Sequence, residues 1–351
     1  MDKPEVIECG VLGYGATFDF GRAHGKWMNA TGRMRLAAVW SRSQERREKA
    51  KADFPGVRTY TTVDEMLADP AIDLVAVVTP HFTHRDLTVQ ALRAGKHVVV
   101  DKAMACTVAE CSEMVEAARS SGRTLAVFHN RQHDGNFRRI LQLVRDGVLG
   151  EVFDVECWAG GFGAPSKSWY YDQKAGGGVM HLWGPHAMDW VLRVLPGKIA
   201  GVDAYAQKRL WNEVDIQDQQ RIMLRFETGA TAEVAFSHIA LASRPLWRIL
   251  GTRGAIVDSG EHSLHGYCPQ YQDGLPPLGK LTLVRFDGGR RVKEDVPYLP
   301  SEWGQFYRDM AAHLLDGAPV PVSAELGRRT IAVFEAADRS CISGHTAVPD
   351  F

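Results

Sequence analysis

The stretch Gly10-Val11-Leu12-Gly13-Tyr14-Gly15 decides the fold, because it ends one apolar run and leads into an amphipathic one. Val6–Leu12 predicts a buried strand, and a helix is predicted from about Gly21 to Ala30. Glycines between a strand and a helix let the backbone approach a pyrophosphate at the helix N-terminus. Phe18 stands where the third glycine of this pattern is usual, and the next glycine is Gly21. We therefore expect a phosphate loop about three residues longer than the common form.

Short apolar runs alternate with amphipathic ones through the first third of the chain. Further strands are predicted at Leu36–Trp40, Leu74–Val78, Val98–Val100 and Leu125–Phe128, with helical segments between them. Strands separated by helices form βαβ units and a parallel sheet. Residues 1–128 are therefore predicted to form a doubly wound α/β domain of the Rossmann type, which binds a dinucleotide.

The pattern changes near Gly147–Gly150, after which strand candidates follow one another with few helices between them. These candidates are Val152–Ala159, Gly201–Lys208, Gln220–Phe226, Ala230–His238, Trp247–Gly251, Leu281–Phe286 and Arg291–Val296. Sequential strands of this kind indicate a large, mainly antiparallel sheet with one open face. We predict an α+β domain over residues 129–351 for substrate binding and oligomerisation. One helix interrupts its strands at Gly177–Val194, and a C-terminal helix at about residues 324–343 packs back on the first domain.

Composition narrows the function. The 351 residues carry 41 Lys and Arg against 42 Asp and Glu, a net charge of −1 that argues against a nucleic-acid-binding protein. No apolar run approaches the ~18 residues of a membrane helix, and the first residues do not resemble a secretory signal. The six cysteines are scattered without a C-x-x-C pair, so we expect no metal site. We expect the protein to be located in the reducing cytoplasm.

The end of the second strand bears on the choice of dinucleotide. An acid at this position typically binds the ribose hydroxyls of NAD, whereas Arg or small polar residues accommodate the 2′-phosphate of NADP. The chain has Trp40-Ser41-Arg42-Ser43 here and no acid before Glu45. This favours NADP over NAD, although Arg42 can equally stack on adenine or point into solvent.

Several segments together resemble the Gfo/Idh/MocA family of NAD(P)-dependent oxidoreductases. The matching segments lie in the same order as in the family and span nearly the whole chain. They are Thr79-Pro80-His81 with His84, Asp101-Lys102-Ala103, His129-Asn130-Arg131, Gly176-Gly177-Gly178 followed by Gly184, His186 and Asp189, and Gly251-Thr252-Arg253-Gly254. The chain departs from the family pattern at Asp101 for Glu, Ala103 for Pro and His81 for Asn. It also has Leu182 where the family has an Asp four residues before the catalytic His.

The resemblance implies roles for particular residues. His186 would act as acid and base, which suits an imidazole with a pKa near 6.5, and Lys102 would polarise the reacting oxygen. Expected substrate contacts are Asp189, His181, Arg131, Trp158 and Tyr170. Expected cofactor contacts are Gly13, Tyr14, Gly15, Ala16, Thr17, Phe18, Ser41, Arg42, Thr79, Pro80, His81, His84, Asp101, Lys102 and Asn130.

The activity implied by the resemblance is hydride transfer between NAD or NADP and a secondary alcohol or ketone of a sugar, glycoside or cyclic polyol. Because Leu182 replaces the Asp, a second hypothesis stays open, in which a retained cofactor oxidises the substrate transiently to drive elimination or glycoside cleavage. A non-catalytic dinucleotide sensor is a third. The resemblance also implies a homodimer or homotetramer formed through the open sheet face of the second domain.

Overall fold

The computed structural model describes residues 6–15, 19–165, 168–258 and 279–351. The chain forms two compact units. The first comprises residues 1–130 and 303–328, and the second comprises residues 131–302 and 329–351. Each unit is built around one sheet, so the change of pattern in the sequence corresponds to a change of architecture.

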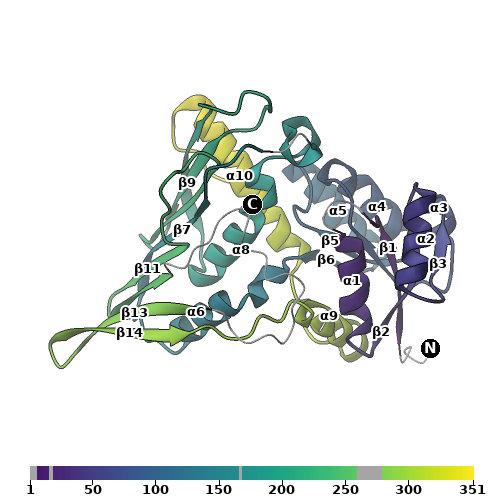
Figure 1. Ribbon diagram of the computed structural model, residues 1–351, viewed down its shortest axis with the longest axis horizontal. Coiled ribbons are helices and arrows are strands. Elements are labelled where there is room, and N and C mark those ends of the chain that lie inside the picture. The colour runs from purple at the N-terminus through teal and green to yellow at the C-terminus, as the bar shows by residue number, and fades with distance from the viewer. Residues whose placement is uncertain (1–5, 16–18, 166–167, 259–278) are drawn as a thin grey trace. The chain divides into compact units, whose positions relative to one another are not determined.

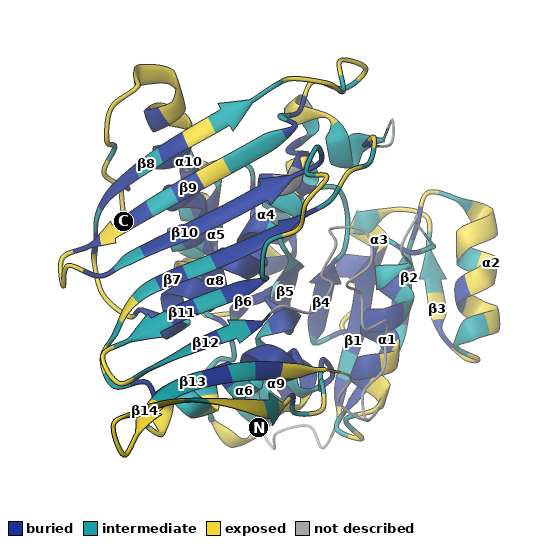
Figure 2. Ribbon diagram, turned by 60° about the vertical axis from the view of Figure 1, so that its left-hand side comes forward, coloured by how far each residue is buried: buried dark blue, intermediate teal, exposed yellow. Residues whose placement is uncertain are grey.

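Sheet A of the first unit is parallel, with strand order β3-β2-β1-β4-β5-β6 (Figure 1 and Figure 2). Its strands are β1 (Ile7–Leu12), β2 (Met34–Trp40), β3 (Arg58–Tyr60), β4 (Leu74–Val77), β5 (His97–Asp101) and β6 (Leu125–Phe128). The central strands β1, β4 and β5 are mainly apolar and buried, because helices cover a parallel sheet on both faces. The order reverses between β1 and β4, which in such folds is where a dinucleotide binds. The parallel fold predicted for this region is confirmed, and the short strand β3 is an addition.

The helices of the first unit are α1 (Phe20–Asn29), α2 (Gln44–Asp53), α3 (Val63–Leu67), α4 (His84–Arg93), α5 (Val108–Ser121) and α9 (Gln305–Asp316). Several of them begin or end at recognisable caps. Thr62 caps α3, since Thr62 Oγ1 accepts from Glu65 N and Glu65 Oε2 accepts from Thr62 N. Gly95 follows α4 with φ +80°, as a C-terminal glycine does. Local sequence therefore decides where these helices stop.

Sheet B of the second unit has the order β14-β13-β12-β11-β7-β10-β9-β8 (Figure 2). Its strands are β7 (Val152–Gly160), β8 (Ile199–Gln207), β9 (Gln219–Phe226), β10 (Thr231–Ser237), β11 (Trp247–Gly251), β12 (Gly254–Asp258), β13 (Lys280–Asp287) and β14 (Arg290–Pro297). All neighbouring strands are antiparallel except β7 and β10, which pair in parallel. The mainly antiparallel sheet is confirmed, and β12 is a further strand that the periodicity did not indicate.

Helices cover one face of sheet B. These helices are α6 (Gly135–Arg145), α7 (Val179–Leu182), α8 (Gly184–Val194) and α10 (Ala324–Ser343), with single turns η2 (Asn130–His133), η3 (Trp169–Tyr171) and η4 (Gln173–Ala175). Phe137 of α6, Trp190 of α8 and Trp247 of β11 form an aromatic core on this face, with ring centroids 5.5–5.9 Å apart. The helix Gly177–Val194 expected from sequence is in fact two helices, because the chain breaks at Trp183.

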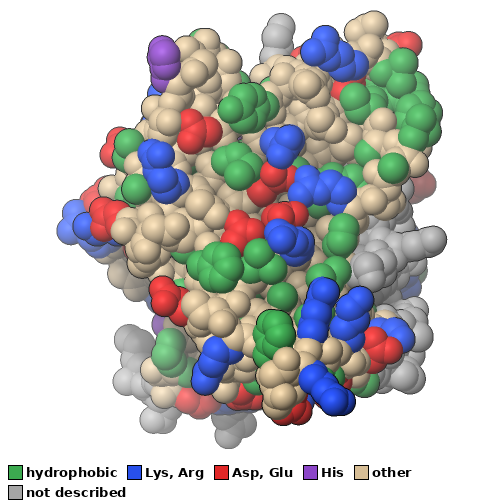
Figure 3. Space-filling model, turned by 90° about the vertical axis from the view of Figure 1, so that its left-hand side faces the viewer, with side chains coloured by type: hydrophobic (Ala, Val, Ile, Leu, Met, Phe, Trp, Pro, Cys, Tyr) green, Lys and Arg blue, Asp and Glu red, His purple; other side chains and the backbone are tan. Residues whose placement is uncertain are grey.

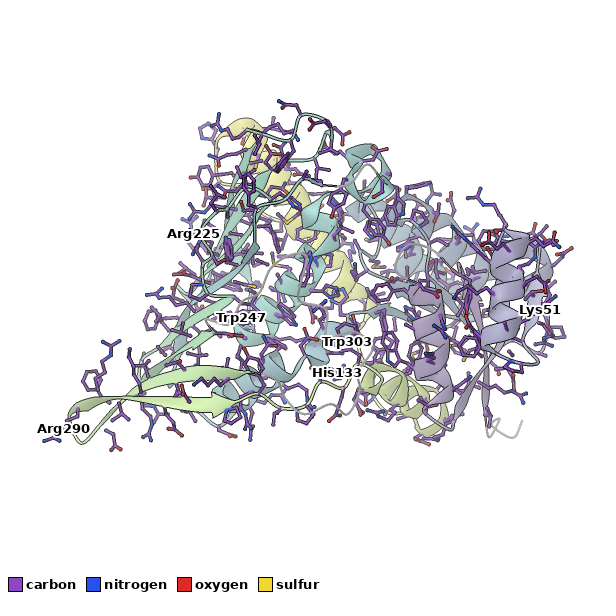
Figure 4. The ribbon with its side chains drawn as sticks, viewed as in Figure 1. Lys51, His133, Arg225, Trp247, Arg290 and Trp303 are labelled. Atoms are coloured by element: carbon purple, nitrogen blue, oxygen red, sulfur yellow. The ribbon has the colours of Figure 1, made fainter. Side chains whose placement is uncertain are left out.

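The other face of sheet B carries alternating charges. Figure 3 shows acidic and basic side chains close together near the middle of this face and hydrophobic ones around them. Glu233 binds Arg221 and Arg244, and Arg244 also reaches Glu156 at 2.8 Å. Burial alone would raise the pKa of the Glu233 carboxyl, but the hydrogen bonds from the two arginines lower it. In Figure 4, Arg225 marks this face and Arg290 marks the turn between β13 and β14.

Candidate active site

The turn between β1 and α1 leaves no room for side chains at its glycines. Gly13 has φ +106°, and a Cβ there would lie 2.1 Å from the Val78 carbonyl oxygen. A Cβ on Gly21 would lie 2.2 Å from the Gly13 oxygen. Helix α1 therefore begins directly against the turn, and its N-terminus can face a phosphate group. The turn fits a dinucleotide; the expected contacts Ala16, Thr17 and Phe18 lie outside the described residues.

Two acids brace this turn, and neither was singled out from the sequence. Asp19 precedes α1 and its Oδ1 accepts from Gly15 N at 3.2 Å. Lys49 of α2 pairs with both Asp19 and Asp53, and Arg22 also pairs with Asp53, so two cations balance the two negative charges near the turn. The Tyr14 hydroxyl donates to Asp53 at 2.7 Å, and burial together with this bond raises the pKa of Tyr14. The Tyr14 hydroxyl is therefore held by Asp53 of α2.

The end of β2 is rich in cations. Ser41 is buried and Arg42 is exposed. Arg47 donates to the carbonyl oxygens of Ser41 at 2.6 Å and Arg42 at 3.2 Å, which holds this corner in place. Arg46 was missed in the sequence, and its aliphatic stem lies against Gly15, where a Cβ would be 3.0 Å from the Arg46 Cγ. Three arginines, Arg42, Arg46 and Arg47, thus follow the end of β2, and the stem of Arg46 lies against the β1–α1 turn.

The segments after β4 and β5 are joined through two histidines. His84 is fully buried, with Nδ1 2.8 Å from the Ala103 oxygen and Nε2 2.8 Å from the Thr79 oxygen. Burial lowers the pKa of His84, opposed by the Asp101 carboxylate and by these carbonyls. His81 Nε2 lies 3.1 Å from the Lys102 oxygen. The two histidines therefore connect the ends of neighbouring strands at the edge where the cofactor is expected.

Lys102 follows β5 at this same edge. Its backbone N–H donates to Asp101 Oδ1 at 2.8 Å, and its peptide bond to Ala103 is cis. The Thr79 and Thr83 hydroxyls lie 2.7 Å apart, and the Pro80 oxygen accepts from Thr83. Most of the described residues expected to bind the cofactor thus lie at the carboxyl ends of β1, β2, β4 and β5. Asn130, at the start of η2, follows the carboxyl end of β6, which pairs in parallel with β5.

Helix α8 of the second unit carries His186. The imidazole is 5% exposed, on the first turn after the break at Trp183. Asp189 lies one turn further on, 1% exposed, and both of its oxygens accept from Arg193 Nε at 3.0 Å. Arg193 was missed in the sequence, although its spacing of four residues from Asp189 is the usual signal for a helical ion pair. Asp189 therefore has a cation as partner, and its expected contact with substrate stays a prediction.

The other expected substrate contacts lie in different parts of the second unit. Arg131 pairs with buried Asp134 at 3.1 Å. Tyr170 stacks on Trp169, and its carbonyl oxygen accepts from Gly178 N at 2.7 Å, just before α7. Removal of the His181 imidazole from water lowers its pKa to about 4, so the ring is neutral at physiological pH. Trp158 lies on the face of sheet B that carries the ion pairs, opposite the face on which α8 packs. Trp158 is thus not brought together with His186.

Within the described parts of the chain, no group of three or more His, Cys, Asp or Glu side chains is placed to hold a metal ion. No described helix is both long and apolar enough to cross a membrane.

Comparison with known families covers both units. Residues 7–129 match the family described as "Oxidoreductase family, NAD-binding Rossmann fold", and residues 137–257 match the GFO/IDH/MocA C-terminal domain. The chain is 28% identical to scyllo-inositol 2-dehydrogenase (NADP(+)) IolW of Bacillus subtilis, over 96% of this chain and 94% of the relative. It is 30% identical to the uncharacterized oxidoreductase YdgJ of Escherichia coli, over 90% of this chain and 92% of the relative.

Solved structures show the same architecture. The chain superimposes on the Bacillus subtilis protein YvaA, titled an oxidoreductase, with a TM-score of 0.87 at 24% identity, covering 100% of both chains. At this level of identity the likeness establishes the fold.

Proposed function

This chain belongs to the Gfo/Idh/MocA family of NAD(P)-dependent oxidoreductases, and we propose that it acts on a secondary alcohol or ketone of a sugar, glycoside or cyclic polyol. The observation that carries the choice of substrate is the similarity to a scyllo-inositol dehydrogenase along 96% of the chain. Such a relative oxidises a ring carbon that bears a hydroxyl group.

A nicotinamide dinucleotide, when bound, supplies or accepts the hydride. The β1–α1 turn would hold its pyrophosphate, since Gly13 and Gly21 let the start of α1 pack directly against the turn. The segments after β4 and β5, with His81 and Lys102, would hold its nicotinamide half. These assignments use the groups that the first unit places at the carboxyl edge of sheet A.

His186 and Lys102 are the residues to which we assign the proton chemistry. Oxidation of an alcohol releases a hydroxyl proton, and we propose that the His186 imidazole takes it up and returns it in reduction. The Lys102 ammonium would donate a hydrogen bond to the reacting oxygen and favour its alkoxide-like state. The low exposure of His186 supports this role, because water is largely excluded from around the imidazole.

We propose NADP as the preferred dinucleotide. Arg42 follows β2 directly and the stem of Arg46 lies against Gly15 of the β1–α1 turn. A 2′-phosphate is expected at the end of this strand. Glu45 is exposed on the first turn of α2, and the strand end itself carries no acid for the ribose hydroxyls. The named relative uses NADP(+) as well.

The test is a panel of inositols, monosaccharides and glycosides, each assayed at 340 nm with NAD and NADP. We expect turnover with at least one cyclic polyol or sugar, faster with NADP. The variant His186→Asn should then lose most of this turnover and still bind NADPH. Absence of turnover with every member of the panel would contradict the proposed substrate class.

Leu182 supports one alternative. The residue at this position has no group for proton transfer, so the second candidate is a reaction that does not need a second acid there. In that reaction a retained cofactor oxidises the substrate only transiently. Mass spectrometry of the small molecules released by heating the purified protein distinguishes the two. A stoichiometric dinucleotide supports retention, and an empty protein supports a dehydrogenase that exchanges its cofactor every cycle.

A further inference from the structure

The break between α7 and α8 is built around Trp183. The residue has φ −102° and ψ −31°, and Pro185 follows in the first turn of α8. The Trp183 carbonyl oxygen accepts from His186 N and from Ala187 N, both at 3.1 Å. A Cβ on Gly184 would lie 2.8 Å from the Phe334 ring, so the backbone beside Trp183 is closely packed. The backbone N–H of His186 is thus hydrogen-bonded to Trp183, a residue with little conformational freedom.

The indole of Trp183 contacts two charged or titratable side chains. Its ring centroid lies 4.4 Å from the Arg131 Cζ, which is the geometry of a cation–π contact. It also lies 6.2 Å from the His186 ring centroid, at an interplanar angle of 75°. This is an edge-to-face arrangement, which aromatic pairs prefer. The side chains of Arg131, Trp183 and His186 therefore follow one another in a continuous row.

The far end of this row is firmly held. Arg131 is 5% exposed and pairs with Asp134, which is fully buried. The Arg131 carbonyl oxygen accepts from the indole N–H of Trp190 at 2.9 Å. Because Arg131 is held by its side chain and its main chain, the indole stacked on it has a fixed plane. An imidazole packed against that indole inherits a fixed orientation.

We infer that Trp183 is a positioning residue that sets the orientation of the His186 imidazole through ring packing. This inference rests on the acid–base role proposed for His186. Leu182 has no polar side-chain atom, so it cannot orient an imidazole by hydrogen bonding. Trp183, the next residue, instead contacts the His186 ring through its indole. Trp183 itself transfers no proton.

Three variants test the inference through turnover. Trp183→Leu removes the ring, Trp183→Phe keeps a smaller ring, and Trp211→Leu is the matched control, a partly exposed tryptophan of the same unit. With the fastest substrate of the panel, we expect Trp183→Leu to lower kcat about 10- to 100-fold, the cost of misplacing a catalytic group. KM should change by less than about 3-fold, and Trp183→Phe should recover most of kcat. Equal losses in Trp183→Leu and Trp211→Leu would overturn the inference.

A second readout does not depend on turnover. In protein labelled with ¹³C-histidine, the His186 ring signal is assigned by its absence in His186→Asn. Removal of the indole in Trp183→Leu should shift and broaden this signal, whereas Trp211→Leu should leave it in place. An unchanged His186 signal in Trp183→Leu would overturn the inference. Trp183→Met supplies a second variant without a ring if Trp183→Leu folds poorly.

The two proposals fail in different ways. If His186→Asn keeps full turnover, the acid–base role is wrong, and the signal of His186 still reports whether Trp183 holds the ring. If His186→Asn is inactive while Trp183→Leu keeps normal kcat and an undisturbed signal, only the positioning role is wrong.

Discussion

At the residue scale, position in the fold turns common side chains into candidates for chemistry. Lys102 stands out because it follows a buried parallel strand at the edge of the sheet that also carries the glycine turn. His186 stands out because it lies on the first turn of α8 with 5% exposure. His84, by contrast, has a carbonyl oxygen 2.8 Å from each ring nitrogen. His84 therefore connects the segments that follow β4 and β5, which is a structural role.

Removal of either candidate catalytic group should reduce turnover and spare the fold. Lys102→Ala and His186→Ala should each lower kcat by roughly two to four powers of ten, the range for losing acid–base or oxyanion assistance. Steady-state kinetics with the fastest substrate measure this, and NADPH binding to His186→Ala should be unchanged. The control is Lys51→Ala, an exposed lysine on α2 labelled in Figure 4. Near-normal kcat in either variant would remove that residue from the mechanism.

The arginines after β2 should decide between the two dinucleotides. Loss of a hydrogen bond to a charged group costs about 1.5–3 kcal/mol, so Arg42→Ala and Arg46→Ala should each raise the KM for NADP roughly 10- to 100-fold. The KM for NAD should stay nearly constant. Arg93→Ala, an exposed arginine at the end of α4, is the control. Equal effects on NAD and NADP would contradict a contact with the 2′-phosphate.

At the scale of elements, the site depends on how closely one helix approaches one turn. Helix α1 begins beside Gly13 because Gly21 has no side chain to hold the two apart. Helices α2, α3 and α5 of the first unit begin where a capping side chain accepts from a free backbone N–H. Thr107 and Glu110 form such a capping box at the start of α5, each side chain accepting from the other's backbone N–H at 3.1–3.2 Å.

Gly21→Ala should separate α1 from the turn and weaken cofactor binding. The added Cβ would lie 2.2 Å from the Gly13 carbonyl oxygen, a contact that only a backbone shift relieves. We expect the Kd for NADPH, measured by fluorescence titration, to rise at least about tenfold. The control is Gly317→Ala, which strains the left-handed end of α9 at φ +76° and lowers stability without touching the turn. If both variants bind NADPH equally well, the close approach at Gly21 is not needed for binding.

At the scale of the whole molecule, buried histidines link stability to pH. Burial lowers the pKa of His24 to about 4, from an ordinary value of 6.5. Between these values the unfolded chain binds a proton that the folded chain excludes, so the free energy of unfolding falls as pH falls from 6.5 to 4. One such histidine contributes roughly 3 kcal/mol to this loss, and stability above pH 6.5 is unaffected by it.

Urea unfolding at pH 4.5 to 7.5 checks this dependence. The midpoint of the wild type should fall steeply below pH 6.5. His24→Gln should show a shallower fall, and the exposed His345→Gln should follow the wild type. A wild-type midpoint that is constant across this range would contradict the prediction.

We propose that the open face of sheet B joins copies of this chain. The face combines the ion pairs around Glu233 with exposed apolar side chains such as Tyr205, at 63% exposure, and Phe286, at 74%. Large exposed apolar side chains beside polar ones are typical of protein interfaces. Light scattering should give a mass of two or four chains, and Tyr205→Glu with Phe286→Glu should lower it. A wild-type mass near 38.8 kDa would contradict an oligomer.

The sequence by itself determined the features that depend on neighbouring residues. Glycines at a strand–helix turn, the period of apolar residues and the capping residues act over a few positions, so β1, the turn and most helices of the first unit were predictable from the printed chain. The order of motifs likewise indicated the family, and with it Lys102 and His186.

Tertiary structure alone decided the features that join distant parts of the chain. The parallel pairing of β7 with β10, and the stacking of Arg131 on Trp183, connect residues more than fifty positions apart. The break at Trp183 had a local signal that was not used, since Pro185 stands in the first turn of α8, where a helix tolerates proline. Packing energies between distant side chains set these contacts, and nothing in the local sequence records which partner each side chain will meet.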